Sequence, residues 1–171
     1  MSKFIGTYCR TNSTLAYDSP IEDITIEKNR ITIGSKINSR DFTVVNDTIT
    51  VNDANGDAYY LKYFSDANCL CLDYDIVKGE KITNTKLLSI AQQRSGNFDY
   101  QESAYYGMEY FTNDGSYLSI NQITKEYYQG YYTYKNGLLR VYDTNSKRTR
   151  TWYFSNDGYI YVVVYTKTTT N

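Results

Sequence analysis

Residues 132–141, YTYKNGLLRV, contain two alternating runs that flank an Asn-Gly pair. Alternation of apolar and polar residues with a period of two is typical of a strand that buries one face. Asn-Gly between two such runs is a strong hairpin signal, because both residues tolerate the positive φ that tight turns require. Residues 126–135 and 138–143 are therefore predicted to form two paired antiparallel strands.

Short alternating runs and polar turns continue in both directions from this hairpin. A second Asn-Gly pair, at 55–56, separates the runs 48–52 and 59–64. Further turns are predicted at 46–47, 113–115 and 156–158. Turn signals that recur about every eight to twelve residues are typical of a β-sandwich or a β-barrel.

The composition agrees with an all-β fold. The 171 residues include 21 Tyr and only one Pro, and Tyr, Ile, Val and Thr favour strands. The predicted fold is an antiparallel meander barrel, or two related small barrel or sandwich units. The one expected exception is a short helix near 83–94, with Thr83 or Asn84 as its cap and Gly96 as its stop. A strand is the alternative for this segment.

The second half of the chain repeats part of the first half at an offset of 90 residues. Seven of the twenty-nine positions in 46–74 are identical in 136–164, and the turns coincide. Each unit reads as a meander of hairpins, which is stable only when several strands share a core. We expect a first repeat over 1–80, a connector over 81–95 and a second repeat over 96–171.

The alternation assigns a set of apolar side chains to the interior of these repeats. They are Ile49, Val51, Leu70, Leu72, Leu139, Val141, Ile160, Val162 and Val164. At the offset of 90, Tyr60 and Lys62 align with Arg150 and Trp152, and these four are expected to face outward. Function is expected on the outer faces, where the two repeats diverge.

The composition also excludes several functions. The chain has no histidine, which rules out Ser-His-Asp and Cys-His nucleophile systems and every histidine-ligated metal site. A net charge of −1 gives no general attraction for nucleic acid or anionic membranes. No apolar run reaches the ~20 residues of a membrane span, and no long apolar stretch marks a secretory signal. We therefore expect a cytoplasmic protein.

Neither the cysteines nor the acidic turns predict a metal site or a cofactor. Three cysteines make no complete disulfide framework, and Cys69 and Cys71 should lie on one face of a strand as small buried thiols. A redox or metal pair lacks the usual C-x-x-C spacing. Residues 53–57 (DANGD) alternate oxygen-bearing side chains as calcium loops do, but no suitably spaced Glu follows, which favours a plain hairpin turn.

The candidate binding residues come from the tyrosine pairs and from one basic strand. Consecutive strand residues point to opposite faces, so one ring of each Tyr-Tyr pair should pack inward while the other meets solvent or a partner. On the strand 148–154, basic residues alternate with an aromatic one, as in some nucleic-acid or phosphate sites, although a solvated strand face is the plainer interpretation. The candidates are Tyr60, Tyr128, Tyr131, Arg148, Arg150 and Trp152.

The hairpin 132–141, followed by WYFSNDG at 152–158, resembles the meanders of small bacterial lipocalin-like (calycin) proteins. Gly6-Thr7-Tyr8 resembles the glycine–aromatic opening of such barrels. The resemblance implies an antiparallel barrel. The chain departs from that family in being duplicated and in lacking a Trp near its start, so no binding residue of the family is transferred to it.

Three functional hypotheses follow. The first is a non-enzymatic binding protein that takes a small apolar ligand or a protein partner through a Tyr-rich surface or lumen. The second is an inhibitor or immunity-type protein of a microbe or phage that acts by protein–protein contact. The third is a cyclase- or isomerase-type barrel enzyme. A lined cavity, a filled core with an exposed Tyr patch, and a cleft with a desolvated carboxylate are their respective signatures.

Overall fold

The computed structural model describes residues 2–10, 23–35, 37–73, 77–78, 97–100, 103–112, 114–121, 125–161 and 163–168. Apart from a single 3-10 turn, η1 (Ser2–Phe4), every regular element in these residues is a β-strand. The prediction of an all-β antiparallel fold is confirmed. The segment 83–94, where a helix or a strand was expected, lies outside the described residues. No helix in the described part of the chain is long and apolar enough to cross a membrane.

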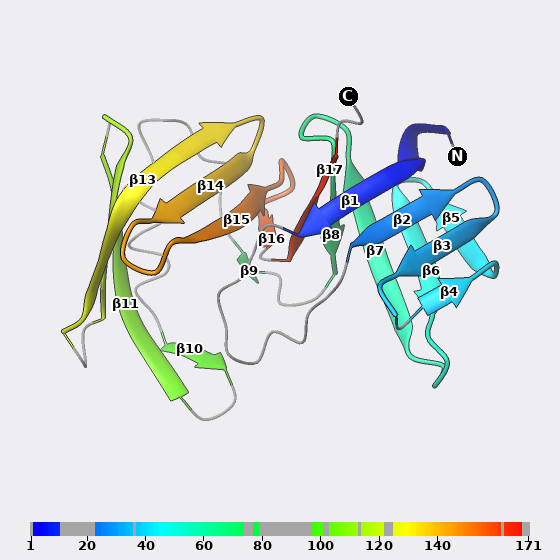
Figure 1. Ribbon diagram of the computed structural model, residues 1–171, viewed down its shortest axis with the longest axis horizontal. Coiled ribbons are helices and arrows are strands. Elements are labelled where there is room, and N and C mark those ends of the chain that lie inside the picture. Colours follow the sequence, from blue (N-terminus) through cyan, green and yellow to red (C-terminus); the bar gives the residue numbers. More distant parts are fainter. Residues whose placement is uncertain are drawn as a thin grey trace.

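The first sheet is a nearly closed antiparallel barrel of nine strands (Figure 1). Its order is β4-β3-β2-β1-β17-β8-β7-β6-β5. The strands are β1 (Gly6–Arg10), β2 (Ile24–Glu27), β3 (Arg30–Ile33), β4 (Ile37–Ser39), β5 (Phe42–Val45), β6 (Thr48–Asn52), β7 (Ala58–Phe64), β8 (Cys69–Leu72) and β17 (Val164–Lys167).

The second sheet is a half-barrel of eight strands in the order β10-β11-β12-β13-β14-β15-β16-β9. The strands are β9 (Val77–Lys78), β10 (Asn97–Tyr100), β11 (Ser103–Phe111), β12 (Ser116–Asn121), β13 (Tyr127–Lys135), β14 (Leu138–Asp143), β15 (Arg148–Phe154) and β16 (Tyr159–Tyr161). The predicted Asn-Gly hairpin joins β13 and β14, with φ of 52° at Asn136 and 78° at Gly137. Gly137 is required there, because a Cβ would lie 2.7 Å from the Phe154 carbonyl oxygen.

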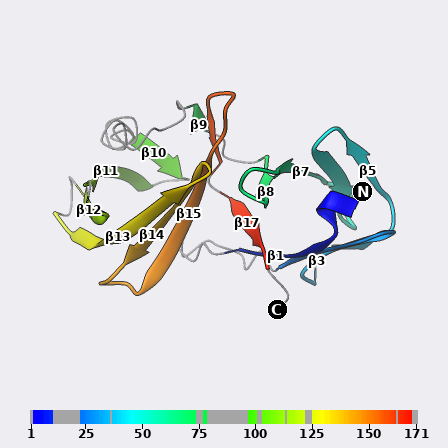
Figure 2. The ribbon, with the colours of Figure 1, turned by 90° about the horizontal axis from the view of Figure 1, so that it is seen from above.

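Each sheet includes a strand from the other half of the chain. The chain reaches the second sheet through β9, which pairs with β16. It then returns to the first sheet, where the last strand, β17, lies between β1 and β8 (Figure 2). The barrel is thus completed by residues from the far end of the sequence. The expected division into 1–80, 81–95 and 96–171 stays a prediction, and its connector lies outside the described residues.

Side chains fill the interior of the barrel. Fifteen buried hydrophobic residues form one cluster, which includes Phe4, Tyr8, Ile49 and Tyr63. The Tyr8 hydroxyl, which is fully buried, donates a hydrogen bond of 2.9 Å to the Phe4 carbonyl oxygen. Every described residue predicted to point inward is buried, and Val162 lies outside the described residues. The inward prediction is wrong for Val164, which packs outside the barrel core with Cys69 and Cys71, while Tyr165 points into the barrel.

The two halves differ in strand register by one residue. Leu61 of β7 lies opposite Ile49, whereas Trp152 of β15, and not Thr151, lies opposite Leu139. The turns account for this difference. In the first sheet, five residues lie between the last paired residues of β6 and β7, and four lie between those of β7 and β8. In the second sheet the order is reversed, with four residues between β14 and β15 and five between β15 and β16. As a result β15 is displaced by one position relative to both of its neighbours.

This displacement reverses the faces of β15, because a slip of one residue moves every side chain to the other side of a sheet. Tyr63 packs in the barrel core, but its sequence counterpart Tyr153 packs outside the half-barrel core. Phe154 and Trp152 occupy that core instead. The expectation that Arg150 and Trp152 face outward is therefore wrong: Arg150 lies opposite the core residue Val141, and only 4% of Trp152 is exposed.

Candidate functional site

Among the second-sheet residues whose burial the structure describes, the most exposed aromatic side chains lie on the outer side of β13. Exposure alternates strictly along β13 and leaves Tyr127 58% and Tyr131 56% exposed. We call this surface the outward face. It comprises Tyr127, Gln129, Tyr131, Thr133 and Lys135 of β13 with Leu138, Arg140 and Tyr142 of β14.

The centre of the outward face is a stacked pair of tyrosines. The rings of Tyr131 and Tyr142, which lie opposite each other on β13 and β14, have centroids 5.0 Å apart and planes 29° apart. Gly130, next to Tyr131, permits the close approach of the two strands, because a Cβ there would lie 1.8 Å from the Tyr142 carbonyl oxygen. The stacking holds Tyr131 in place although more than half of it is exposed.

One end of the outward face is fixed by the turn that follows β14. The Thr144 hydroxyl donates a hydrogen bond of 2.6 Å to the Gln129 carbonyl oxygen. The Asn145 side chain donates one of 3.2 Å to the Tyr127 carbonyl oxygen. Within the turn, the buried Asp143 carboxylate accepts the backbone N–H groups of Asn145 and Ser146 at 2.7 and 3.0 Å. The exposed tyrosines therefore stand on a rigid scaffold.

Two of the predicted binding residues meet on the opposite, concave side of the same sheet. The Arg150 guanidinium lies 5.3 Å from the ring centroids of both Trp152 and Tyr117 and donates a hydrogen bond to the Tyr117 hydroxyl. Arg150 is half-buried, whereas Trp152 and Tyr117 are buried. This cluster is a packed cation–π arrangement of the half-barrel core rather than an open basic surface.

The other predicted residues lie apart from this cluster. Arg148 is exposed at the start of β15, opposite Asp143, and Tyr128 is half-buried on β13, opposite Ser119. Tyr60 is 47% exposed on β7, in the other sheet. Tyr131 is the only one of the six on the outward face.

Sequence reasoning missed Tyr127 and Tyr142, although a signal for them was present. Residues of one strand that share a face are separated by an even number of positions. Tyr131 and Tyr128 are three positions apart and cannot share a face, whereas Tyr127 and Tyr131 can. The inward prediction for Val141 likewise places the adjacent Tyr142 outward.

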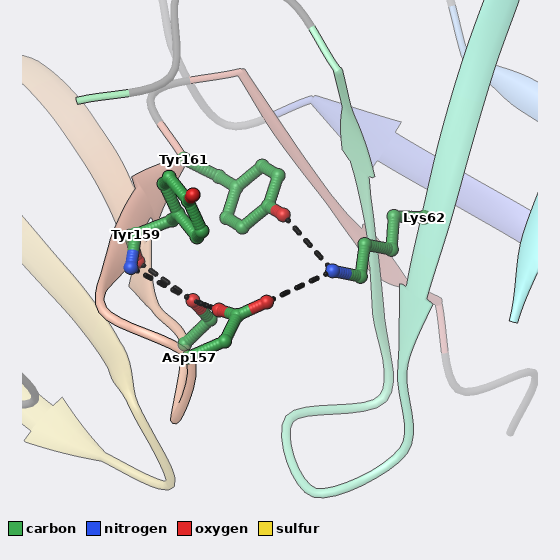
Figure 3. Close-up of polar contacts among 5 residues, drawn as sticks. Lys62, Asp157, Tyr159 and Tyr161 are labelled. Atoms are coloured by element: carbon green, nitrogen blue, oxygen red, sulfur yellow. Dashed lines mark hydrogen bonds and ion pairs between the residues drawn. The ribbon is translucent and has the colours of Figure 1, made fainter. Parts of the chain in front are cut away.

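A second cluster joins the two sheets. The Lys62 Nζ on β7 donates hydrogen bonds to Asp157 Oδ2 at 3.1 Å and to the Tyr161 hydroxyl at 3.3 Å, both from the second sheet and its β15–β16 turn (Figure 3). Burial alone would lower the pKa of Lys62, but these two partners raise it overall. Burial would raise the pKa of Asp157, yet hydrogen bonds from Ser155 and Lys62 lower it. Both groups are therefore charged at neutral pH.

Behind the Lys62–Asp157 ion pair the two sheets meet through largely apolar side chains, and we call this contact region the joint. The ring of Phe64 lies 4.2 Å from that of Tyr153 and 5.0 Å from that of Tyr161. The fully buried Cys69 and Cys71 lie beside them with sulfur atoms 3.9 Å apart, on one face of β8 as predicted. Burial raises the pKa of the Cys71 thiol well above its usual value. Burial and the neighbouring Asp66, which accepts the Tyr153 hydroxyl hydrogen bond at 2.8 Å, raise the pKa of Tyr153.

The acidic stretch 53–57 forms the predicted hairpin turn between β6 and β7. The Asp53 carboxylate accepts the backbone N–H groups of Asn55 and Asp57 at 2.8 and 3.0 Å. Across the described residues, no three His, Cys, Asp or Glu side chains are grouped so that they could hold a metal ion.

A scan against protein-family models, a search of curated proteins and a search of solved structures each gave no match to this chain.

Proposed function

We propose that this protein is a non-enzymatic binding protein that docks another protein on the outward face of β13 and β14. The observation that carries the proposal is the exposed Tyr131 ring, which stacks on the half-buried ring of Tyr142. Tyrosine supplies a large contact area and a polar tip at low cost in side-chain entropy, and it is enriched at protein interfaces. A rigid aromatic anchor of this kind is the usual centre of a binding hot spot.

A protein partner is favoured over a small apolar ligand because of how the barrel is filled. Large side chains such as Tyr8 and Phe4 occupy its interior, and even their polar atoms are paired with each other. A ligand-binding barrel needs an apolar cavity of a few hundred cubic ångströms. The inhibitor or immunity-type hypothesis is one form of the same proposal, since it requires the same surface.

The enzyme hypothesis finds less support. Asp143, a buried carboxylate of the second sheet, is 5% exposed and already accepts two backbone N–H groups of its own turn. Such a group stabilises the turn and is poorly placed to move protons. The antiparallel barrel is compatible with the calycin-like resemblance, which we retain as part of the proposal. A cytoplasmic location is also proposed, because all three cysteines are free thiols.

The experiment is to purify the protein from its own source, identify any bound protein by native mass spectrometry, and measure affinity for variants. Tyr131→Ala is expected to weaken binding at least tenfold, the loss typical of an interface anchor. Tyr60→Ala, which removes an exposed tyrosine from the other sheet, is the matched control and should bind like the wild type. A co-purified small molecule in place of a protein, or equal losses in both variants, would contradict the proposal.

A further inference from the structure

The joint between the two sheets surrounds one ammonium group with the partners that ammonium ions prefer. Lys62 Nζ has the Asp157 carboxylate at 3.1 Å and the Tyr161 hydroxyl at 3.3 Å. It also lies 5.4 Å from the ring centroid of Phe64 and 5.8 Å from that of Tyr161. A carboxylate, a phenol hydroxyl and an aromatic ring within about 6 Å are partners that cation recognition sites use.

These partners are held in place by contacts that do not involve Lys62. The Ser155 hydroxyl hydrogen bonds to the other oxygen of Asp157 and accepts the Tyr159 backbone N–H at 3.2 Å (Figure 3). Tyr161 is 2% exposed and packs with Tyr153 and Phe64. The carboxylate, the phenol and the ring are therefore expected to keep their positions when the lysine side chain is absent.

The site is also open to solvent on one side. The side chains of Lys62 and Asp157 are 34% and 48% exposed, so a small ion can reach the carboxylate without unfolding of the joint. Lys3 has similar partners at the end of the barrel, namely Asp47 and the rings of Phe4 and Tyr63. The Lys3 and Asp47 side chains are half exposed, at 50% and 52%, and lack the walls that the second sheet gives the joint.

We propose that the joint is a binding site for a primary alkylammonium group, which Lys62 occupies from within the chain. The site takes an external alkylammonium, either a free amine or the lysine side chain of another protein, when the Lys62 ammonium is withdrawn. In this conformation Lys62 acts as a built-in ligand that ties the barrel to the half-barrel.

Chemical rescue tests this proposal directly. Lys62→Ala leaves a gap that matches propylammonium, which restores the three missing carbons and the ammonium group. The variant should keep the wild-type circular dichroism spectrum and melt about 2–4 °C lower, as expected for loss of a partly exposed ion pair in a protein of this size. Propylammonium should restore most of this loss in a saturable manner.

The controls test whether rescue needs the positive charge of the ligand, the Asp157 carboxylate and the position of Lys62. Propan-1-ol lacks the charge and tetramethylammonium lacks N–H donors, so neither should restore the stability of Lys62→Ala. Lys62→Met fills the gap with an uncharged side chain, and Lys62→Ala combined with Asp157→Asn removes the anion, so neither should respond to propylammonium. Lys167→Ala should not respond either, because the partners of the Lys167 ammonium among the described residues are the Tyr8 ring, whose centroid is 5.6 Å away, and the Lys3 carbonyl oxygen, and not a carboxylate.

The two sources of the ammonium group are separated by a second probe. Nα-acetyl-lysine methylamide carries its ammonium on a peptide-linked stem and rescues Lys62→Ala only if a protein lysine can reach the site. Rescue by propylammonium alone assigns the site to free alkylamines. Absence of rescue by both, rescue that survives Asp157→Asn, or equal binding of propylammonium to the wild type would each overturn the proposal.

Discussion

The ring of Phe64 lies 4.2 Å from the ring of Tyr153, although the offset of 90 aligns Phe64 with Phe154 and Tyr153 with Tyr63. The pairs Tyr63-Phe64 and Tyr153-Phe154 are identical in sequence but point their side chains to opposite faces of their sheets. In the first sheet Tyr63 fills the barrel and Phe64 reaches the joint, while in the second Phe154 fills the half-barrel and Tyr153 reaches the joint. The one-residue displacement of β15 lets the two halves present complementary aromatic surfaces to each other.

This reversal predicts unequal effects of the same substitution at aligned positions. Phe154 is 1% exposed in the half-barrel core, so Phe154→Ala should cost about 3–5 kcal/mol of unfolding free energy. Phe64 is half-buried at the joint, and Phe64→Ala should cost about half as much. Urea denaturation of the two variants measures both. Equal losses would mean that the aligned residues have equivalent environments, against the register described above.

Val141 tests the inward face of β14. It is fully buried in the half-barrel core, and Val141→Asp would place an unpaired charge there at a cost of about 4 kcal/mol or more. Arg140→Asp changes the neighbouring residue on the exposed side and should shift the melting temperature by no more than about 2 °C. Thermal unfolding followed by circular dichroism separates the two. An unchanged melting temperature in Val141→Asp would refute the register of β14.

Strand β17 should be essential for the barrel, because it pairs with β1 on one side and with β8 on the other. Truncation after Val163 removes the whole strand, including Tyr165, which is 1% exposed. We expect this truncated protein to lose cooperative unfolding and to bind hydrophobic dyes. Truncation after Thr168 retains β17 and the hydrogen bonds of Thr168 to the Thr7 carbonyl oxygen, and serves as the control. A folded barrel without β17 would refute this role.

The turn before β12 predicts an acid-sensitive contribution to stability. Hydrogen bonds from the Thr112 hydroxyl and from Ser116 lower the pKa of Asp114 to about 2. Because the folded pKa lies below the unfolded value, the contribution is fully present above pH ~4 and is lost as the pH falls towards 2. The melting temperature of Asp114→Ala should therefore lie below that of the wild type at pH 6, and the gap should close near pH 2. A gap that does not change with pH would contradict this assignment.

Local features of the fold were readable from the sequence because they depend on neighbouring residues. Asn136-Gly137 between alternating runs predicted the β13–β14 hairpin, and the alternation placed Ile49 and Val141 inside. The same rule, applied to β13, places Tyr127 and Tyr131 on one face of the strand and Tyr128 on the other. What these patterns predict is the pairing of adjacent strands and the side of the sheet on which each residue lies.

The remaining features depend on interactions that sequence alignment does not record. Identity between Tyr63-Phe64 and Tyr153-Phe154 says nothing about register, which is decided by turns that differ in length by one residue. The return of β17 to the first sheet is a non-local pairing, and no local pattern in 164–167 distinguishes it from a strand of the second sheet. The Lys62–Asp157 ion pair joins residues 95 positions apart and exists only because the two sheets meet.

The most direct test of the proposed function is site-specific photo-crosslinking on the outward face. A photoreactive amino acid at Gln129 lies between Tyr127 and Tyr131 on the exposed side of β13 and leaves both tyrosines intact. The control position is Thr43, which is exposed on β5 of the barrel. In extracts of the source cells, we expect one dominant protein adduct at Gln129, its loss on Tyr131→Ala, and no such adduct at Thr43. The same adduct at both positions, or none at Gln129, would contradict it.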